Sequence, residues 1–544
     1  MSQQESCPSP IPSEQLARST LLVTGITIIS RLLGFARDVV IAYTLGGSAA
    51  ADVFVAVFRI PNFVRRLVAE GAVSMPFIPE YCRRRNQGEL EGGSAEGERR
   101  AMLFCRSAML WVLLVFTPLC GLGMIFPDQA MLLVAPGFIH RPQSIDAAAT
   151  LMRLLLPYTL ILCTLAIGGG IMQSRGRFLS PVINPCIPNV VVLLAMGFAI
   201  WIGDIHLYPL ETGEPAHAAL IFCQALIFSG LLQWVYVGNN MRQEKLRWPG
   251  PVQLKPAISF IKKVPLSLCG TATHQANILI AGMGASFLAE GAVAQFHYAD
   301  QLITLPLGMF GMAIGIIALP KFTELASQDR LDDLRLGLTD NMALGLYLSL
   351  PAAAGLAGIA DPLVTILFMR GAFDVSAAHG TALALQGSCL ALPALAIARP
   401  LLAACHVKGY LKLAAGAGII SMASTAALCI TLPKAFTAFA APSLSIFGIG
   451  LAVSAGAWVF ALLLWVCLRH KKLTPKPGDL ASMGLPIILC VVIFAGTWLV
   501  CERLDASPWM KVGTLVSLCM LIYFFITNAA GCPEAKAVFK AFKK

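Results

Sequence analysis

The sequence predicts an all-α polytopic membrane protein of about 14 transmembrane helices, with two six-helix halves around a central cavity and two additional C-terminal helices. Of the 544 residues, 57% are hydrophobic and 13% are charged, whereas soluble domains are roughly 45–50% apolar and 25% charged. Apolar runs of about 20 residues, enough to cross a ~30 Å hydrocarbon core, recur along the chain. This composition excludes an ordinary soluble enzyme, a disordered chain and a small disulfide scaffold.

The predicted spans begin after a polar segment, residues 1–18, that contains three prolines and has no signal-peptide pattern. The second and eighth spans contain Pro61 and Pro306, and we expect both helices to bend there. In chain order the predicted spans are 19–43, 49–80, 102–126, 148–173, 181–202, 217–238, 257–283, 291–319, 338–359, 377–405, 412–431, 442–468, 481–500 and 512–530.

The distribution of basic residues predicts the orientation. With the N-terminus assigned to the cytoplasm, 27 basic residues fall on the cytoplasmic side and 5 on the opposite side, when charges at span ends are counted with the loops. Cytoplasmic loops of membrane proteins carry such an excess, so both termini are predicted to be cytoplasmic. The net charge of +11 is then a topology signal and not a mark of nucleic-acid binding. Basic loops such as Arg83-Arg84-Arg85 are interpreted in the same way, in preference to specific lipid recognition.

A weak internal repeat predicts the domain organisation. Ala135-Pro136-Gly137-Phe138 follows the third span and Arg370-Gly371-Ala372-Phe373 follows the ninth, and each precedes a helix that reaches a proline. Six spans per repeat is an even number, so the halves share one orientation, a common transporter plan. The predicted parts are a cytoplasmic N-terminal segment (1–18), an N-terminal six-helix half (19–240), a cytoplasmic linker (241–256), a C-terminal six-helix half (257–470), and two additional helices with a basic tail (471–544).

Charged side chains inside the spans are the candidate functional groups. A charge at mid-bilayer costs about 2.5–3.5 kcal/mol on the insertion scale, so these groups must face a wet cavity or form ion pairs. Arginine presents a planar fork of donors that matches phosphate oxygens, which favours a phosphate or pyrophosphate ligand. The alternatives are mutual pairing with Asp52 and Glu70 and, for arginines near span ends, snorkelling. The arginines are Arg31, Arg37, Arg59, Arg65, Arg66, Arg106, Arg153 and Arg399.

Signatures of catalysis and of cofactor binding are missing from the sequence. It contains no His-Glu-x-x-His, no P-loop and no Gly-x-Ser-x-Gly. The 16 cysteines are scattered without a Cys-x-x-Cys pair. We therefore expect mostly free thiols, no disulfide framework, no metal site and no cofactor.

Several segments carry a family signature. Ser30-Arg31-Leu32-Leu33-Gly34-Phe35-Ala36-Arg37-Asp38 resembles the first-helix motif of the MurJ (MviN) lipid II flippases. The likeness continues in Ala51-Asp52-Val53-Phe54, in Arg59 to Leu67 (RIPNFVRRL), in Glu70 to Ser74 (EGAVS), in Ala135 to Phe138 and in Tyr298-Ala299-Asp300. Together with the span count, the resemblance covers nearly the whole chain.

The resemblance implies a member of the multidrug/oligosaccharidyl-lipid/polysaccharide exporter superfamily. Such proteins carry the undecaprenyl-pyrophosphate-linked peptidoglycan precursor, lipid II, from the inner to the outer leaflet of the bacterial cytoplasmic membrane by alternating access. The family pattern implies Arg31, Arg37, Asp52 and Arg65 as cavity residues. To these substrate-binding candidates we add Arg59, Arg66 and Gln301, where Gln301 stands in the place of the family's usual arginine.

The resemblance also bears on partners. It implies that the last two spans form an apolar groove for the polyprenyl tail. The expected partners are the lipid-linked precursor and membrane lipids, with no nucleic acid, and we expect a monomer. Coupling to a monovalent ion or to the membrane potential stays open.

Two other functions are kept as alternatives. A cation-coupled multidrug exporter of similar fold predicts a cavity with net negative charge and aromatic walls. A polytopic membrane enzyme, such as a lipid phosphatase or glycosyltransferase, predicts catalytic carboxylates or histidines clustered at one membrane face. The excess of arginine within the spans favours the flippase.

Overall fold

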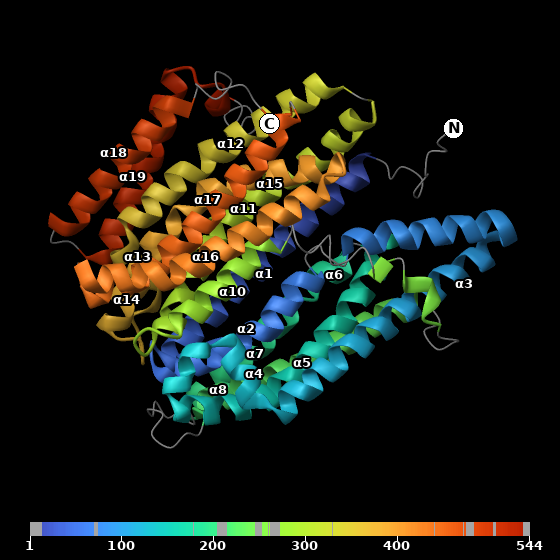
Figure 1. The fold of residues 1–544 in the computed structure, drawn as a ribbon, viewed down its shortest axis with the longest axis horizontal. Coiled ribbons are helices and arrows are strands. Elements are labelled where there is room, and N and C mark those ends of the chain that lie inside the picture. The colour runs from blue at the N-terminus through green and yellow to red at the C-terminus, as the bar shows by residue number, and fades with distance from the viewer. Residues whose placement is uncertain are drawn as a thin grey trace. The chain divides into compact units, whose positions relative to one another are not determined.

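The described part of the chain is almost entirely helical (Figure 1). The computed structural model describes residues 13–69, 74–177, 179–203, 215–244, 253–258, 260–261, 272–328, 330–439, 441–471, 473–474, 483–503 and 507–536, and no strand occurs among them. The helices are α1 (Ser13–Leu45), α2 (Ala49–Ala69), α3 (Ser74–Ile125), α4 (Pro127–Val134), η1 (Pro136–His140), α5 (Pro142–Ser174), α6 (Leu179–Ile183), α7 (Cys186–Trp201), α8 (His217–Gln243), η2 (Lys255–Ala257), α10 (Thr273–Ala285), α11 (Ala292–Ser327), α12 (Leu331–Gly358), α13 (Ala360–Phe368), α14 (Val375–Cys389), α15 (Ala391–Val407), α16 (Leu411–Phe439), η3 (Pro442–Leu444), α17 (Ser445–His470), α18 (Gly484–Arg503) and α19 (Pro508–Ala529).

The all-α membrane fold is confirmed. Among the described residues, 8 helices are long and apolar enough to cross a membrane. The number rises to 10 when two bent pairs are each taken as one span, α12 with α13 at 75° and α14 with α15 at 40°. These numbers are consistent with the predicted fourteen spans without reaching that count.

The chain forms two compact units. The first unit comprises residues 1–45 and 49–272, and the second comprises residues 46–48 and 273–544. Each unit contains a short helix that leads through a turn into a longer helix, α4 before η1 and α5 in the first, and α13 before α14 in the second. These are the two places where the sequence shows its internal repeat.

One apolar core of the first unit lies between α2, α3 and α5. Phe77 and Phe104 of α3 pack with their ring centroids 5.2 Å apart, and Ile167 of α5 is fully buried beside them. Val64 of α2 belongs to the same cluster, as does Phe260 from the segment after α8. Burial of this apolar surface, worth about 25 cal/mol per Å², holds α2 and α3 in place.

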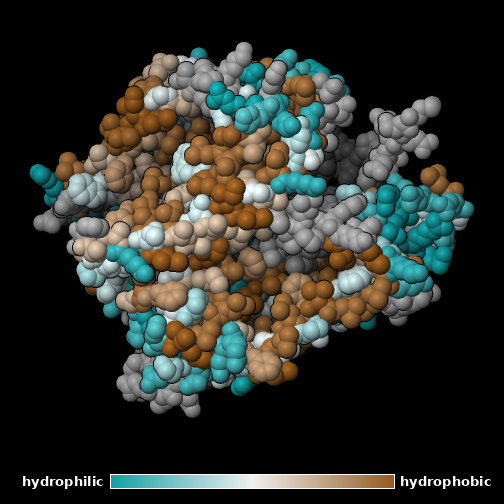
Figure 2. All heavy atoms as spheres, viewed as in Figure 1, coloured by the Kyte–Doolittle hydropathy of each residue, from teal (hydrophilic) through white to brown (hydrophobic). Residues whose placement is uncertain are grey.

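Residues 81–101, predicted as a loop, are helical and form part of α3, so that prediction is wrong. The predicted second span, 49–80, covers α2, which ends at Ala69, and the start of α3 at Ser74, and residues 70–73 between them lie outside the described residues. Helical dihedral angles are interrupted only at Gly92 and Gly93, where this polar part of α3 doubles back as a hairpin (Figure 1). Ion pairs spaced three or four residues apart stabilise the two arms: Arg85–Glu89 at 3.0 Å, Arg99–Glu96 at 2.6 Å and Arg100–Glu96 at 2.8 Å. Figure 2 shows hydrophilic side chains gathered over this hairpin, whereas hydrophobic side chains cover much of the rest of the visible face.

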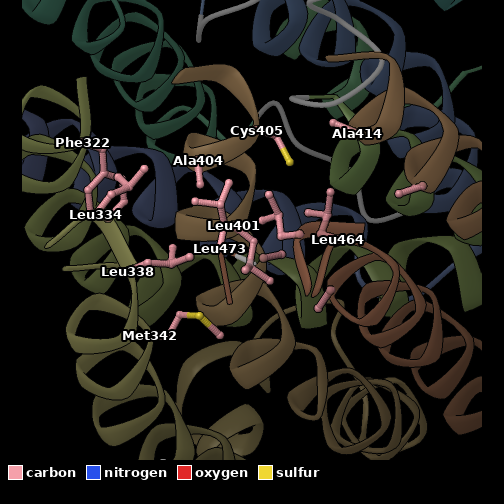
Figure 3. Close-up of a cluster of buried hydrophobic side chains, with 14 of the residues drawn as sticks. Phe322, Leu334, Leu338, Met342, Leu401, Ala404, Cys405, Ala414, Leu464 and Leu473 are labelled. Carbon is pink, nitrogen blue, oxygen red and sulfur yellow. The ribbon is translucent and has the colours of Figure 1, made fainter. Parts of the chain in front are cut away.

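The second unit packs around α17. In Figure 3, Phe322 of α11, Leu338 of α12, Leu401 of α15 and Leu464 of α17 converge in one apolar cluster. Helix α19 is attached through a buried polar network, in which the hydroxyl of Tyr523 donates to the carbonyl oxygen of Tyr347 on α12 at 2.8 Å.

Candidate substrate site

Arg37 on α1 is held by two helices besides its own. Its Nε and Nη2 donate to the same carboxylate oxygen of Asp38 at 3.1 and 2.9 Å, and its Nη1 donates to Oδ1 of Asn189 on α7 at 3.1 Å. The guanidinium carbon lies 5.1 Å from the ring centroid of Phe58 on α2, a cation–π distance. Asp38 is 1% exposed, and Arg37 compensates its buried negative charge within the first unit.

Asn189 orients this guanidinium. Its Nδ2 donates to the carbonyl oxygens of Ser30 on α1 and Pro185 at 3.2 Å each, which turns Oδ1 toward Arg37. A Cβ atom at Gly34 would lie 3.5 Å from Nδ2 of Asn189, so a small residue at this position leaves room for the amide. The α1–α7 contact thus places an acceptor where Arg37 needs one.

Arg65 lies further along α2, which continues as one helix through Pro61. Its Nε and Nη2 donate to Oδ1 of Asn62 at 3.3 and 3.0 Å. The positive charges of Arg65 and of Arg37 both act on the hydroxyl of Tyr158, a buried residue of α5. The two arginines, distant in sequence, therefore approach the same side chain.

Asp52 lies near the other end of α2. The rise of 1.5 Å per residue places it about 20 Å from Arg65 along the helix axis. Its carboxylate is 1% exposed and lies 3.5 Å from Nη1 of Arg141, which follows η1 and is 19% exposed. Arg141 lies in a connection between predicted spans, and the structure gives it a buried acidic partner.

The other candidates are spread over both units. Arg31 is half-buried on α1 and Arg59 is buried on α2. The side chain of Arg66 lies outside the described residues. Gln301 is a half-buried residue of α11, in the second unit, and its Nε2 lies 3.5 Å from Nε2 of His297.

The Tyr298-Ala299-Asp300 motif lies in a packed part of the second unit. Tyr298 is fully buried, and its ring contacts those of Phe368 and Phe373 at centroid distances of 5.3 and 5.5 Å. Its hydroxyl donates to the carbonyl oxygen of Gly46 at 3.2 Å. Gly46 has φ +64°, and a Cβ atom there would lie 2.2 Å from the carbonyl oxygen of Ala372, so the turn requires glycine.

Within the described part of the chain no group of three or more His, Cys, Asp or Glu side chains is placed to hold a metal ion. The cysteines that the structure describes are free thiols, and most are buried.

Three contributors to the site had no distinctive signal in the sequence. Asn189 and Tyr158 are single polar residues in apolar runs, and Arg141 stands among ordinary loop charges. The hydrogen bond from Arg37 to Asn189 and the ion pair between Arg141 and Asp52 join residues that are far apart in sequence, so only the folded chain reveals them.

Comparison with known proteins identifies the family. A family model described as lipid II flippase MurJ matches residues 41–520. The probable lipid II flippase MurJ of Rhizobium tropici is 27% identical over 532 residues, which cover 95% of this chain and 94% of that protein. The protein of the same description from Vibrio cholerae is 30% identical over 386 residues, covering 68% of this chain and 69% of the relative.

Solved structures agree on the fold. A lipid II flippase MurJ in an inward closed conformation superposes with a TM-score of 0.75 at 20% identity, covering 94% of this chain and 98% of the other. An inward-facing MATE family multidrug transporter of the MOP superfamily gives a TM-score of 0.63 at 13% identity, covering 83% and 98%. Since the family model spans most of the sequence, the chain belongs to the MurJ family of membrane proteins.

Proposed function

We propose that this protein is a flippase that moves lipid II from the inner to the outer leaflet of the bacterial inner membrane by alternating access. Its arginines bind the pyrophosphate of the precursor. The observation that carries the proposal is the environment of Arg37, a guanidinium held inside a membrane unit by Asp38, Asn189 and Phe58. The names of the relatives above agree with this substrate.

Arg37 retains donors for a ligand. A guanidinium carries five N–H groups, and the contacts to described residues use one on Nε, one on Nη1 and one on Nη2. One N–H on each Nη atom remains, and these two can bind phosphate oxygens as a fork. Because three bonds already fix the plane of the group, little additional entropy is lost when the ligand binds.

The charge balance of the first unit favours an anion. Arg31, Arg37, Arg59 and Arg65 lie on α1 and α2, while Asp38 compensates Arg37 and Asp52 pairs with Arg141. Counted together, these residues carry five positive and two negative charges. A cation exporter requires the opposite sign, so the balance supports the flippase over the drug exporter.

The remaining proposals concern the tail, the ligand set and the topology. Helices α18 and α19 expose Ile488, Leu521 and Phe525 by 62%, 70% and 76%, an apolar surface that suits the polyprenyl chain. We include Arg66 and Gln301 in the proposed ligand set. Both termini are proposed to be cytoplasmic, and residues 19–240 and 257–470 are proposed as the two six-helix halves.

The test is a pair of substitutions at Arg37. Charge-assisted hydrogen bonds are worth about 1.5–3 kcal/mol each, so loss of two in Arg37→Ala lowers precursor export by about a hundredfold or more. Arg37→Lys keeps the charge but not the fork and should give an intermediate rate. The measurement is outer-leaflet lipid II in cells that depend on the variant.

Arg153→Ala provides the matched control. Arg153 is an exposed arginine of α5 whose Nε donates to the carbonyl oxygen of Met124 at 3.4 Å. Its removal should leave export near the wild-type rate. Normal export by Arg37→Ala, at equal protein amounts in the membrane, refutes the proposed binding role.

A further inference from the structure

Residues 253–258, part of the stretch between α8 and α10, are docked on α3 by three side chains. Nη2 of Arg84 donates to the carbonyl oxygen of Pro256 at 2.6 Å, and the indole N–H of Trp111 donates to that of Leu254 at 3.1 Å. The hydroxyl of Ser107 donates to the carbonyl oxygen of Gln253. Three side chains of α3 thus satisfy the carbonyl groups of residues 253, 254 and 256 in a largely exposed segment.

An aromatic contact anchors the end of this segment. Phe260 is 1% exposed, and its ring meets those of Phe77 and Phe104 edge-on at 5.9 and 5.7 Å. Ala257, one turn earlier, is fully buried in the same core. Burial of a phenylalanine side chain contributes about as much as several surface hydrogen bonds, so the anchor is strong.

Arg84 makes two further contacts besides its hydrogen bond to Pro256. Its Nε donates to Glu80 at 3.0 Å, and its guanidinium lies 5.2 Å from the ring centroid of Phe104. The reading of Arg83-Arg84-Arg85 as topology signals alone therefore misses a structural role for Arg84. Its planar donors reach an acidic side chain, an aromatic ring and a backbone carbonyl at once, which a lysine does not do.

The same core contains the helix of a candidate substrate residue. Val64 of α2 packs in the cluster that buries Phe260, and Arg65 is the next residue. Displacement of residues 253–260 from α3 opens this cluster on one side. The position of the segment is thereby linked to that of α2.

We propose that residues 253–260 act as a strap that remains docked on α3 throughout the transport cycle. The strap moves with the first unit as one body, and its contacts with α3 are the same in each state of the cycle. This inference rests on the proposed transport function, because it concerns how the cycle is accommodated.

The first test weakens the strap. Ser107→Ala with Trp111→Phe removes two donors and leaves the aromatic core intact. Backbone amides of the strap should then exchange with deuterium about tenfold faster or more, and precursor export should fall severalfold. Exchange as slow as in the wild type overturns the proposal, because it shows that these bonds do not hold the strap.

A matched control exists in α17. Ser454→Ala with Trp458→Phe changes the same two residue types at the same spacing, where Ser454 donates to the carbonyl oxygen of Gly387 at 2.7 Å and Trp458 to that of Leu390 at 3.0 Å. Strap exchange and export should stay at wild-type values. An equal loss of export in the control shows a general loss of stability and overturns the specific role.

The second test fixes the strap in place. Ser107→Cys with Gln253→Cys is oxidised in the full-length protein, with each single variant treated alike. A protein cross-linked in this way should export at nearly the rate of its reduced form. Export that stops on oxidation and returns on reduction overturns the proposal. If the proposed transport function is wrong, the wild type exports no precursor, whereas deuterium exchange in the strap can still be measured. This outcome is therefore distinct from a failure of the strap proposal.

Discussion

The two units bury polar groups of different chemistry. In the first unit, buried Asp38 and Asp52 pair with Arg37 and Arg141. In the second unit Asp300 and Glu534 are also buried, at 8% and 9% exposed, while neutral hydrogen bonds join several of its helices. Asn277 of α10 donates to the hydroxyl of Ser421 at 2.9 Å, and this hydroxyl donates to the carbonyl oxygen of Gly456 at 2.8 Å.

Buried ion pairs and buried neutral hydrogen bonds differ in what they cost the fold. Hydroxyl and amide groups join helices at a desolvation cost that one hydrogen bond nearly offsets. Buried ions cost several kcal/mol each even when they are paired, so a chain retains them where charge has a use. The two arginine–aspartate pairs of the first unit, Arg37–Asp38 and Arg141–Asp52, therefore agree with the anionic ligand proposed above.

The largest expected effect comes from Asp38→Ala. It leaves Arg37 inside the unit without its carboxylate, and breaking a buried pair costs about 3–5 kcal/mol. The free energy of unfolding in detergent should fall by that amount, and precursor export should be lost. Asp333→Ala in the second unit is the control, because its pair with Arg330 is exposed and is worth at most about 1 kcal/mol. Equal losses in the two variants remove the contrast between the units.

A somewhat smaller effect is expected from reversing charges at Asp52 and Arg141. Arg141→Glu brings two carboxylates together and should lower stability and export, whereas adding Asp52→Arg should restore stability. Export that does not return with stability assigns Asp52 a direct role in transport. Arg100→Glu, which faces Glu91 and Glu96 in an exposed cluster, should change stability only slightly. If Arg141→Glu is equally mild, the Asp52 pair is not a structural contact.

The smallest effect is expected in the neutral network of the second unit. Tyr523→Phe removes the bond to the carbonyl oxygen of Tyr347 and should cost about 1 kcal/mol of unfolding free energy, as typical hydrogen bonds do. Export measured at equal protein amounts should stay near normal. Export lost in a stably folded Tyr523→Phe protein shows that the second unit's polar contacts also work in transport.

The sequence predicts the elements of this fold better than their ends. Long apolar runs predict α5, α8 and α17 because a hydrophobic stretch in a bilayer must be helical to satisfy its backbone. The polar part of α3 was missed because its helix depends on side-chain pairs such as Arg85–Glu89 and not on apolar surface. That spacing is readable in the sequence as a charge pattern.

The candidate site was predicted in part. Arg31, Arg37, Asp52, Arg59 and Arg65 stand out because charge is rare within a span. Their partners were not predicted, because Asn189 and Tyr158 are chemically ordinary and matter only through proximity. Which charges are compensated and which remain for a ligand is therefore a property of the folded unit.

By itself, the sequence determined that this chain is helical, lies in a membrane and carries arginine inside its spans. Those properties follow from hydropathy and charge, which can be read along the chain without knowing which residues are in contact in the folded protein. The tertiary structure decided that Asp38 pairs with Arg37, that Asp52 meets Arg141 and that residues 253–260 are docked on α3. Each of these depends on distances between residues far apart in sequence, and packing of the helices sets such distances.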